Sequence, residues 1–98
     1  MSAPVRIGVT PGIDIWSRPW EQRRQAIDLV VDAGIDHVFF ADHVSFRVGH
    51  GHDGMVTAAA VANLHPTIGI YLGVYLLPLR HPIPVARQLA NLSEMAPG

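Results

Sequence analysis

The stretch AGIDHVFFADHV, residues 33–44, decides the fold class of this 98-residue chain. Gly34 occupies the place of the left-handed residue that commonly ends a helix, and Asp36 turns the chain into a new segment. The run from His37 to Ala41 is apolar on both faces, as is typical of a parallel strand covered by helices. The polar pair Asp42 and His43 follows at once. The stretch therefore predicts a helix end, a buried strand and a polar strand end.

The same alternation continues in both directions along the chain. Short β-rich runs lie at 5–9 and at about 68–76, and segments of helical period lie at 20–33, from Asp53 to Pro66, and from the turn at Pro84 to 95. Ser17 is expected to cap the first helix and Asp53 the second. Three apolar residues are expected to point inward from the third helix: Val85, Leu89 and Leu92.

Three strand–helix units of about 30 residues each predict an α/β fold with a parallel sheet. A closed (β/α)₈ barrel needs about 250 residues, so the chain is either a three-unit domain or the first three βα units of a truncated, partial TIM-type barrel. We favour the partial barrel. Residues 1–98 show no composition shift or linker, so we expect one domain and no second one.

Composition excludes several classes of protein. Hydrophobic residues make up 49% and charged residues 15%, with a net charge of −1, so neither disorder nor a nucleic-acid surface is indicated. The absence of cysteine excludes disulfides and thiolate metal sites. The longest apolar run, 68–79, is too short to span a bilayer, which needs roughly 20 residues. With no secretory signal visible, we expect a soluble cytoplasmic protein without a membrane partner.

Chemistry in parallel α/β folds gathers at the carboxyl ends of the strands. His43 is the strongest candidate there, because an imidazole can act near neutral pH as acid, base or hydrogen-bond donor. The alternative is that Asp42 and His43 only end a strand in a polar loop. Arg80 and His81 follow the third strand and could meet a phosphate, but Arg80 could equally pair with Glu94 or with a later loop.

Two further motifs, a histidine-rich loop and a glycine within the third strand, each allow a functional and a structural interpretation. The loop His50-Gly51-His52-Asp53 resembles a metal cluster, and a metal-dependent hydrolase using His43, His50, His52 and Asp53 is one alternative function. Because this loop precedes a helix that Asp53 can cap, we predict no metal site. Gly73-Val74 interrupts the third strand, which indicates a bulge, a close approach to a ligand or a packing glycine. Neither a dinucleotide fingerprint nor a P-loop is present in the sequence.

Four stretches resemble the N-terminal part of the bacterial-luciferase-like monooxygenases, the flavin- and deazaflavin-dependent (β/α)₈ barrel oxidoreductases. They are VRIGV at 5–9, AGIDHVFFADHV at 33–44, DG at 53–54 before an alanine-rich helix, and GVYLLPLRHP at 73–82 leading into VARQLA at 85–90. The last stretch is the most specific. The resemblance implies hydride transfer between an organic substrate and FMN or coenzyme F420, with oxygen as acceptor in the monooxygenase branch.

The resemblance also implies residue roles. His43 corresponds to the catalytic histidine near the reactive part of the ring, and Asp42 to its cofactor-contacting neighbour. Gly73 and Val74 correspond to a non-proline cis peptide that supports the back of the ring, so we predict that this bond is cis. Family members reach full barrel length, and their phosphate-binding loops come later than residue 98. The family implies small-molecule and flavin partners and a homodimer, whereas a non-catalytic remnant that self-associates is a further alternative.

Overall fold

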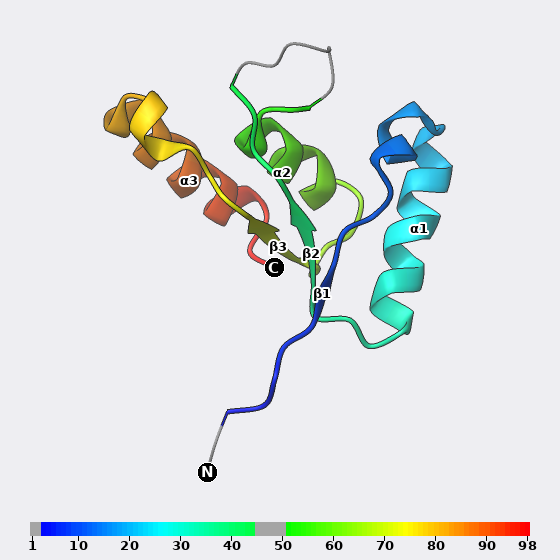
Figure 1. Ribbon diagram of the computed structural model, residues 1–98. Helices are drawn as coiled ribbons and strands as arrows, with labels where there is room; N and C mark the ends of the chain where they lie inside the picture. The colour runs from blue at the N-terminus through cyan, green and yellow to red at the C-terminus, as the bar shows by residue number, and fades with distance from the viewer. Residues whose placement is uncertain (1–2, 45–50) are drawn as a thin grey trace.

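The computed structural model describes residues 3–44 and 51–98. Within them, a three-stranded parallel sheet has the order β1-β2-β3, with β1 at Gly8–Val9, β2 at His37–Phe40 and β3 at Gly69–Leu72. Each strand is followed by a helix: α1 at Trp20–Asp32, α2 at Gly54–Ala62 and α3 at Pro82–Met95. Two short 3₁₀ turns, η1 at Ile13–Ser17 and η2 at Leu77–Leu79, precede α1 and α3. The mixed α/β class with a parallel sheet is confirmed (Figure 1).

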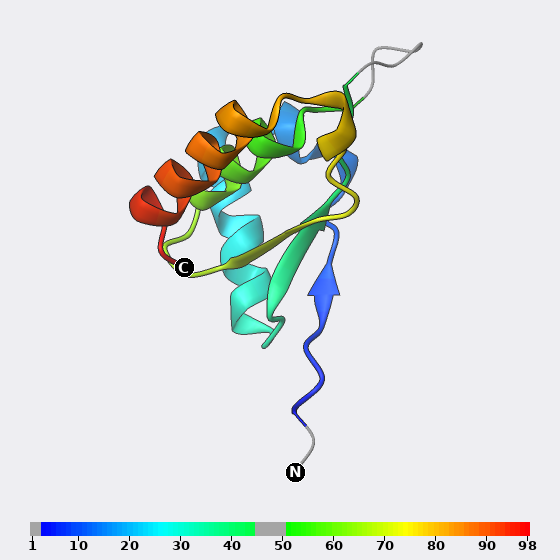
Figure 2. The same ribbon diagram turned by 90° about the vertical axis from the view of Figure 1, so that its left-hand side faces the viewer.

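The three helices lie on one side of the sheet (Figure 2). Alternate residues of β2 face them: Val38 and Phe40 are buried, whereas His37 and Phe39 are only half-buried on the opposite face. The core between sheet and helices comprises Ile15, Ile27, Val38, Phe40, Val61, Leu64 and Ile68. One face of β2 is therefore covered by helices and the other is open, which differs from the strand covered on both faces that the sequence predicts.

The open face carries an aromatic pair. Phe39 of β2 lies beside Tyr71 of β3 in the parallel register, and the two rings stack with centroids 5.7 Å apart. Gly73, two residues beyond Tyr71, lies so close to the Phe39 ring that a β-carbon there would overlap it. This approach explains why a glycine interrupts the predicted third strand.

Both outer strands are shorter than predicted. Val5 and Ile7 are exposed, and only Gly8 and Val9 pair with β2. At the other edge β3 ends at Leu72, opposite Phe40, the last residue of β2. A strand is defined by its ladder of hydrogen bonds, so apolar alternation without a partner segment does not extend it.

Helix ends follow the sequence with one exception. Gly34 has φ of +79° after α1, and the Asp53 carboxylate accepts from the Val56 N–H at 2.9 Å, so both predictions are confirmed. Ser17 does not cap α1, because its hydroxyl donates to the Asp14 carbonyl inside η1 and α1 starts only after Pro19. Val85 is buried, whereas Leu89 is 53% exposed although it points toward Leu72 and Met55, as predicted. Leu89 lies at an open groove between α2 and α3.

No helix in the described ranges combines the length and apolar character needed to cross a membrane.

Candidate functional site

A cavity of about 580 Å³ opens at the carboxyl ends of β1 and β2. It is bounded by the loop after β1, by η1, by the end of β2 and by the start of α2. Its lining is aromatic, small or weakly polar: Thr10, Pro11, Gly12, Trp16, Ser17, Phe39, Phe40, Ala41, His43, Gly51, His52 and Thr57. Among the described residues, no carboxylate and no arginine lines this cavity, so it suits a flat, uncharged ligand surface.

His43 stands at the rim of this cavity. Its backbone N–H donates to the His52 carbonyl at 3.0 Å, which ties the end of β2 to the segment before α2. Its imidazole packs against Gly51, where a β-carbon would lie 2.7 Å from His43 Cγ. Gly51 also has φ of +119°, a conformation that favours glycine. Two separate constraints therefore keep a side chain away from the His43 ring.

Aromatic contacts fix the neighbouring wall. The Trp16 ring lies 5.9 Å from that of Phe40 and meets the His52 ring edge-on at 6.1 Å between centroids. The Arg23 guanidinium lies over the Trp16 ring at 5.7 Å and donates to the Trp16 carbonyl. Trp16 thus packs on the core and lines the cavity at the same time.

Asp42 points away from the cavity into a buried cluster of polar groups. Its side chain is fully buried, and its two carboxylate oxygens accept from the Gly54 N–H at 2.6 Å and from the Leu76 N–H at 2.7 Å. The Arg80 guanidinium donates to both oxygens, at 2.8 and 2.7 Å. A buried carboxylate with four donors is satisfied in its charged form.

Arg80 gathers four partners around one guanidinium. Besides Asp42, it donates to the Asp53 carboxylate at 2.8 Å and to the Leu76 carbonyl at 3.1 Å, and it stacks over the Tyr75 ring at 4.3 Å. We call Asp42, Asp53, Tyr75, Leu76 and Arg80 the Arg80 cluster. The Tyr75 hydroxyl is buried and has no hydrogen-bond partner among the described residues.

Electrostatics keep the cluster ionised. Burial acts to raise the pKa of Asp42, but the hydrogen bonds from Arg80, Leu76 and Gly54 outweigh it and lower that pKa to about 2. The hydrogen bond from Arg80, followed by that from Val56, lowers the pKa of Asp53. Hydrogen bonds to Asp42 and Asp53 raise the pKa of Arg80 above its usual value. None of these three groups therefore changes charge near neutral pH.

The Gly73–Val74 peptide bond is cis, as the sequence predicts. It follows β3 directly, and the Gly73 N–H donates to the Phe40 carbonyl at 2.9 Å. Val74 is 76% exposed.

The structure places the sequence-predicted residues in two groups. His43 joins the cavity with His52, whereas Asp42 joins Arg80 and Asp53 in the buried cluster. Arg80 pairs with Asp42 and Asp53 and not with Glu94, one of the partners that the sequence left open, because the loop after β3 turns Arg80 back toward Asp42, 38 residues earlier. The imidazole of His81 accepts from the Ile83 N–H and caps α3.

The histidine loop does not form a metal cluster in the described part of the chain. His50 lies outside the described residues. Within 3–44 and 51–98, no three histidine, cysteine or acidic side chains come together in a way that could hold a metal ion. Asp53 has its carboxylate engaged by Val56 and Arg80.

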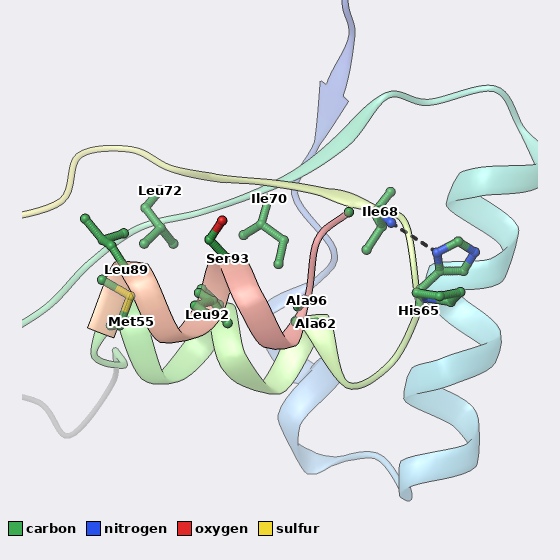
Figure 3. A pocket seen from close by; sticks show the side chains of 13 residues that line it. Met55, Ala62, His65, Ile68, Ile70, Leu72, Leu89, Leu92, Ser93 and Ala96 are labelled. Carbon is green, nitrogen blue, oxygen red and sulfur yellow. Dashed lines mark hydrogen bonds between the residues drawn. The ribbon is translucent and has the colours of Figure 1, made fainter. Parts of the chain in front are cut away.

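A second cavity, of about 280 Å³, lies between β3 and the helices α2 and α3. Figure 3 shows side chains of β3 extending toward those of α2 and α3: Ile70, Leu72, Met55, Leu89 and Leu92. His65 closes one end, where its Nδ1 accepts from the Ile68 N–H at 3.1 Å (Figure 3). This groove is almost wholly apolar and offers packing surface rather than chemistry.

Comparison with known proteins gives the class. The family model for luciferase-like monooxygenases matches residues 2–98. The chain therefore belongs to the luciferase-like monooxygenase family, a family of oxidoreductases, as the four sequence stretches indicated. No curated protein and no solved structure matches the chain significantly.

Proposed function

We propose that residues 1–98 form, as one domain, the first three βα units of a (β/α)₈ barrel oxidoreductase that binds FMN or coenzyme F420. Membership of the luciferase-like monooxygenase family over residues 2–98 supports this proposal. The observation that carries it is the cavity at the carboxyl ends of β1 and β2, with His43 at its rim. In parallel α/β folds this end of the sheet is where ligands bind.

The described residues fit the ring of such a cofactor better than its phosphate. Phe39, Phe40 and Trp16 supply flat apolar walls, and His43 and His52 supply polar edges. A phosphate needs cationic side chains or exposed backbone N–H groups. Because no arginine among the described residues lines the cavity, the phosphate group would be held elsewhere. When bound, the ring supplies the hydride chemistry.

His43 is the residue we assign to proton handling. Its ring lies at the cavity rim, and its orientation is limited by Gly51 and by the hydrogen bond between His43 and His52 backbones. An imidazole there can hold a proton beside a ligand in the cavity or pass it on. Asp42, with its carboxylate oxygens engaged by Gly54, Leu76 and Arg80, supports the neighbouring backbone instead of meeting the ligand.

The experiment is a fluorescence titration of the chain with FMN and with coenzyme F420. Binding by the unaltered chain is expected, and His43→Ala should weaken it. Gly51→Ala should also weaken it, because the added β-carbon would lie 2.7 Å from His43 Cγ and displace the ring.

A matched control is Gly34→Ala. Gly34 shares a positive φ with Gly51, but a β-carbon there meets nothing within 4 Å. Both variants therefore carry the backbone cost of alanine at positive φ, and only Gly51→Ala disturbs His43. Equal affinity for FMN and for coenzyme F420 in Gly51→Ala and Gly34→Ala would contradict the role of His43. No binding of either cofactor, with a mass that rises with concentration, would favour the self-associating remnant.

A further inference from the structure

We propose that Arg80 is the positioning residue of the candidate site: it holds the three segments that carry His43, His52 and the Gly73–Val74 bond in one arrangement. This inference rests on the proposed function, because the segments of His43 and His52 line the proposed cofactor site and Gly73 packs against Phe39, which also lines it. Arg80 itself does not line the cavity. It would act on the ligand only through the backbone that it holds.

Each bond of the Arg80 cluster reaches a different segment. Asp42 immediately precedes His43 at the end of β2. Asp53 immediately follows His52 and caps α2. Leu76, whose N–H is held by Asp42 and whose carbonyl is held by Arg80, lies two residues after Val74. One guanidinium thus joins the end of β2, the start of α2 and the loop after β3, and Asp42 and Leu76 lie 34 residues apart in the chain.

The geometry of these contacts requires a guanidinium. Two nitrogens of Arg80 address both oxygens of Asp42, one also reaches Asp53 and the other the Leu76 carbonyl, while the flat face covers Tyr75. A planar fork with several donors makes all of these contacts at once, whereas an ammonium group is a point charge that cannot stack in this way. Arg80→Lys therefore keeps the charge beside Asp42 but loses the bridge between segments.

The first readout is amide hydrogen exchange in the full chain, and it needs no cofactor. Arg80→Lys should speed exchange about tenfold at Leu76 and Gly54, because Arg80 holds the Asp42 carboxylate that accepts from both amides. Exchange at His43 should also rise, because its acceptor, the His52 carbonyl, adjoins Asp53, which Arg80 holds as well. The Ala33 N–H donates to the Leu29 carbonyl at the end of α1, and its exchange rate should be unchanged. Arg24→Lys is the matched control, since Arg24 also bridges two carboxylates but only within α1.

The second readout separates positioning from stability. Arg80→Lys should weaken FMN binding about tenfold, while the unfolding midpoint stays close to that of Arg24→Lys. The double variant Asp42→Asn with Arg80→Met removes both charges and so leaves no buried ion unpaired. It should regain stability relative to Arg80→Met alone without regaining FMN affinity.

The outcomes are distinguishable. If the unaltered chain binds neither FMN nor coenzyme F420, the proposed function fails, and exchange at Leu76 and His43 alone decides whether Arg80 positions the segments. Unchanged exchange at these amides in Arg80→Lys overturns the inference. So does FMN affinity that follows the unfolding midpoint across all variants, because Arg80 would then be only a structural residue.

Discussion

Two arginines each bridge two carboxylates, and they do so in opposite surroundings. On the surface of α1, Arg24 pairs with Glu21 at 2.7 Å and with Asp28 at 3.1 Å, within one helical turn on either side. At the end of the sheet, Arg80 pairs with Asp42 at 2.7 Å and with Asp53 at 2.8 Å across loops. The Arg24 side chain is 41% exposed and that of Arg80 is 14% exposed, against a fully buried Asp42.

Ion pairs with similar N–O distances therefore need not contribute equally to the free energy of unfolding. Solvent screens the Arg24 pairs, and holding two long side chains costs rotamer entropy, so such pairs contribute little. Removing Arg80 would instead leave the buried charge of Asp42 without its ion-pair partner. Removing Asp42 would leave the Gly54 and Leu76 N–H groups without an acceptor. The ion pairs on α1 connect neighbouring turns of one helix, whereas the Arg80 cluster connects segments that are distant in the sequence.

The largest expected effect comes from Asp42→Ala. It should lower the free energy of unfolding by roughly 3 kcal/mol, because Arg80, Gly54 and Leu76 lose their common acceptor. Urea unfolding followed by circular dichroism measures the change. Glu21→Ala is the matched control and should leave the transition nearly unchanged. Equal losses in the two variants would show that the buried and exposed pairs are equivalent.

Acid should weaken the buried pair at a lower pH than ordinary carboxylates titrate. The folded pKa of Asp42 is about 2, below its usual 3.8, so its contribution to stability is complete above about pH 4 and is lost as the pH falls toward 2. The stability difference between the unaltered chain and Asp42→Asn should therefore shrink over that interval. A difference that stays constant from pH 6 to pH 2 would contradict the depressed pKa.

The smallest effect tests the outer arm of the Arg80 cluster. Asp53→Asn keeps a residue that caps helices well but removes the charge facing Arg80. Because the Asp53 side chain is 43% exposed, the free energy of unfolding should fall by less than about 1 kcal/mol. Asp28→Asn, its counterpart at Arg24, should cause no measurable change. A loss for Asp53→Asn as large as that for Asp42→Ala would mean that the cluster is buried throughout.

Local signals in the sequence located most of the elements. The alternation around residues 33–44 predicted α1, β2 and the turn between them, and Asp53 predicted the start of α2. The strand lengths and the exposure of Leu89 could not be predicted, because they depend on which other segments cover each residue. Ser17 misled because a hydroxyl can also donate to the carbonyl three residues earlier, as Ser17 does to Asp14 inside η1, instead of accepting from the N–H of a following helix.

The candidate site was only partly readable in the same way. His43 could be singled out because it follows a predicted strand, and its place at the cavity agrees with that position. Asp42 carried the same signal, yet the structure turns it into the buried cluster, since adjacent residues at a strand end point to opposite sides. Nothing in the sequence marked Arg80 as the partner of Asp42 and Asp53.

The element types and the parallel α/β class could be predicted from local periodicity and capping residues, which act within a few residues of chain. Short motifs carried the resemblance to luciferase-like monooxygenases, and the cis Gly73–Val74 bond was predicted only because that resemblance implies it. The bridge from Arg80 to Asp42 and Asp53 and the packing of Gly51 on His43 are visible only in the folded chain. Those contacts form where the ends of separate strands meet, and local sequence patterns do not encode the distance between them.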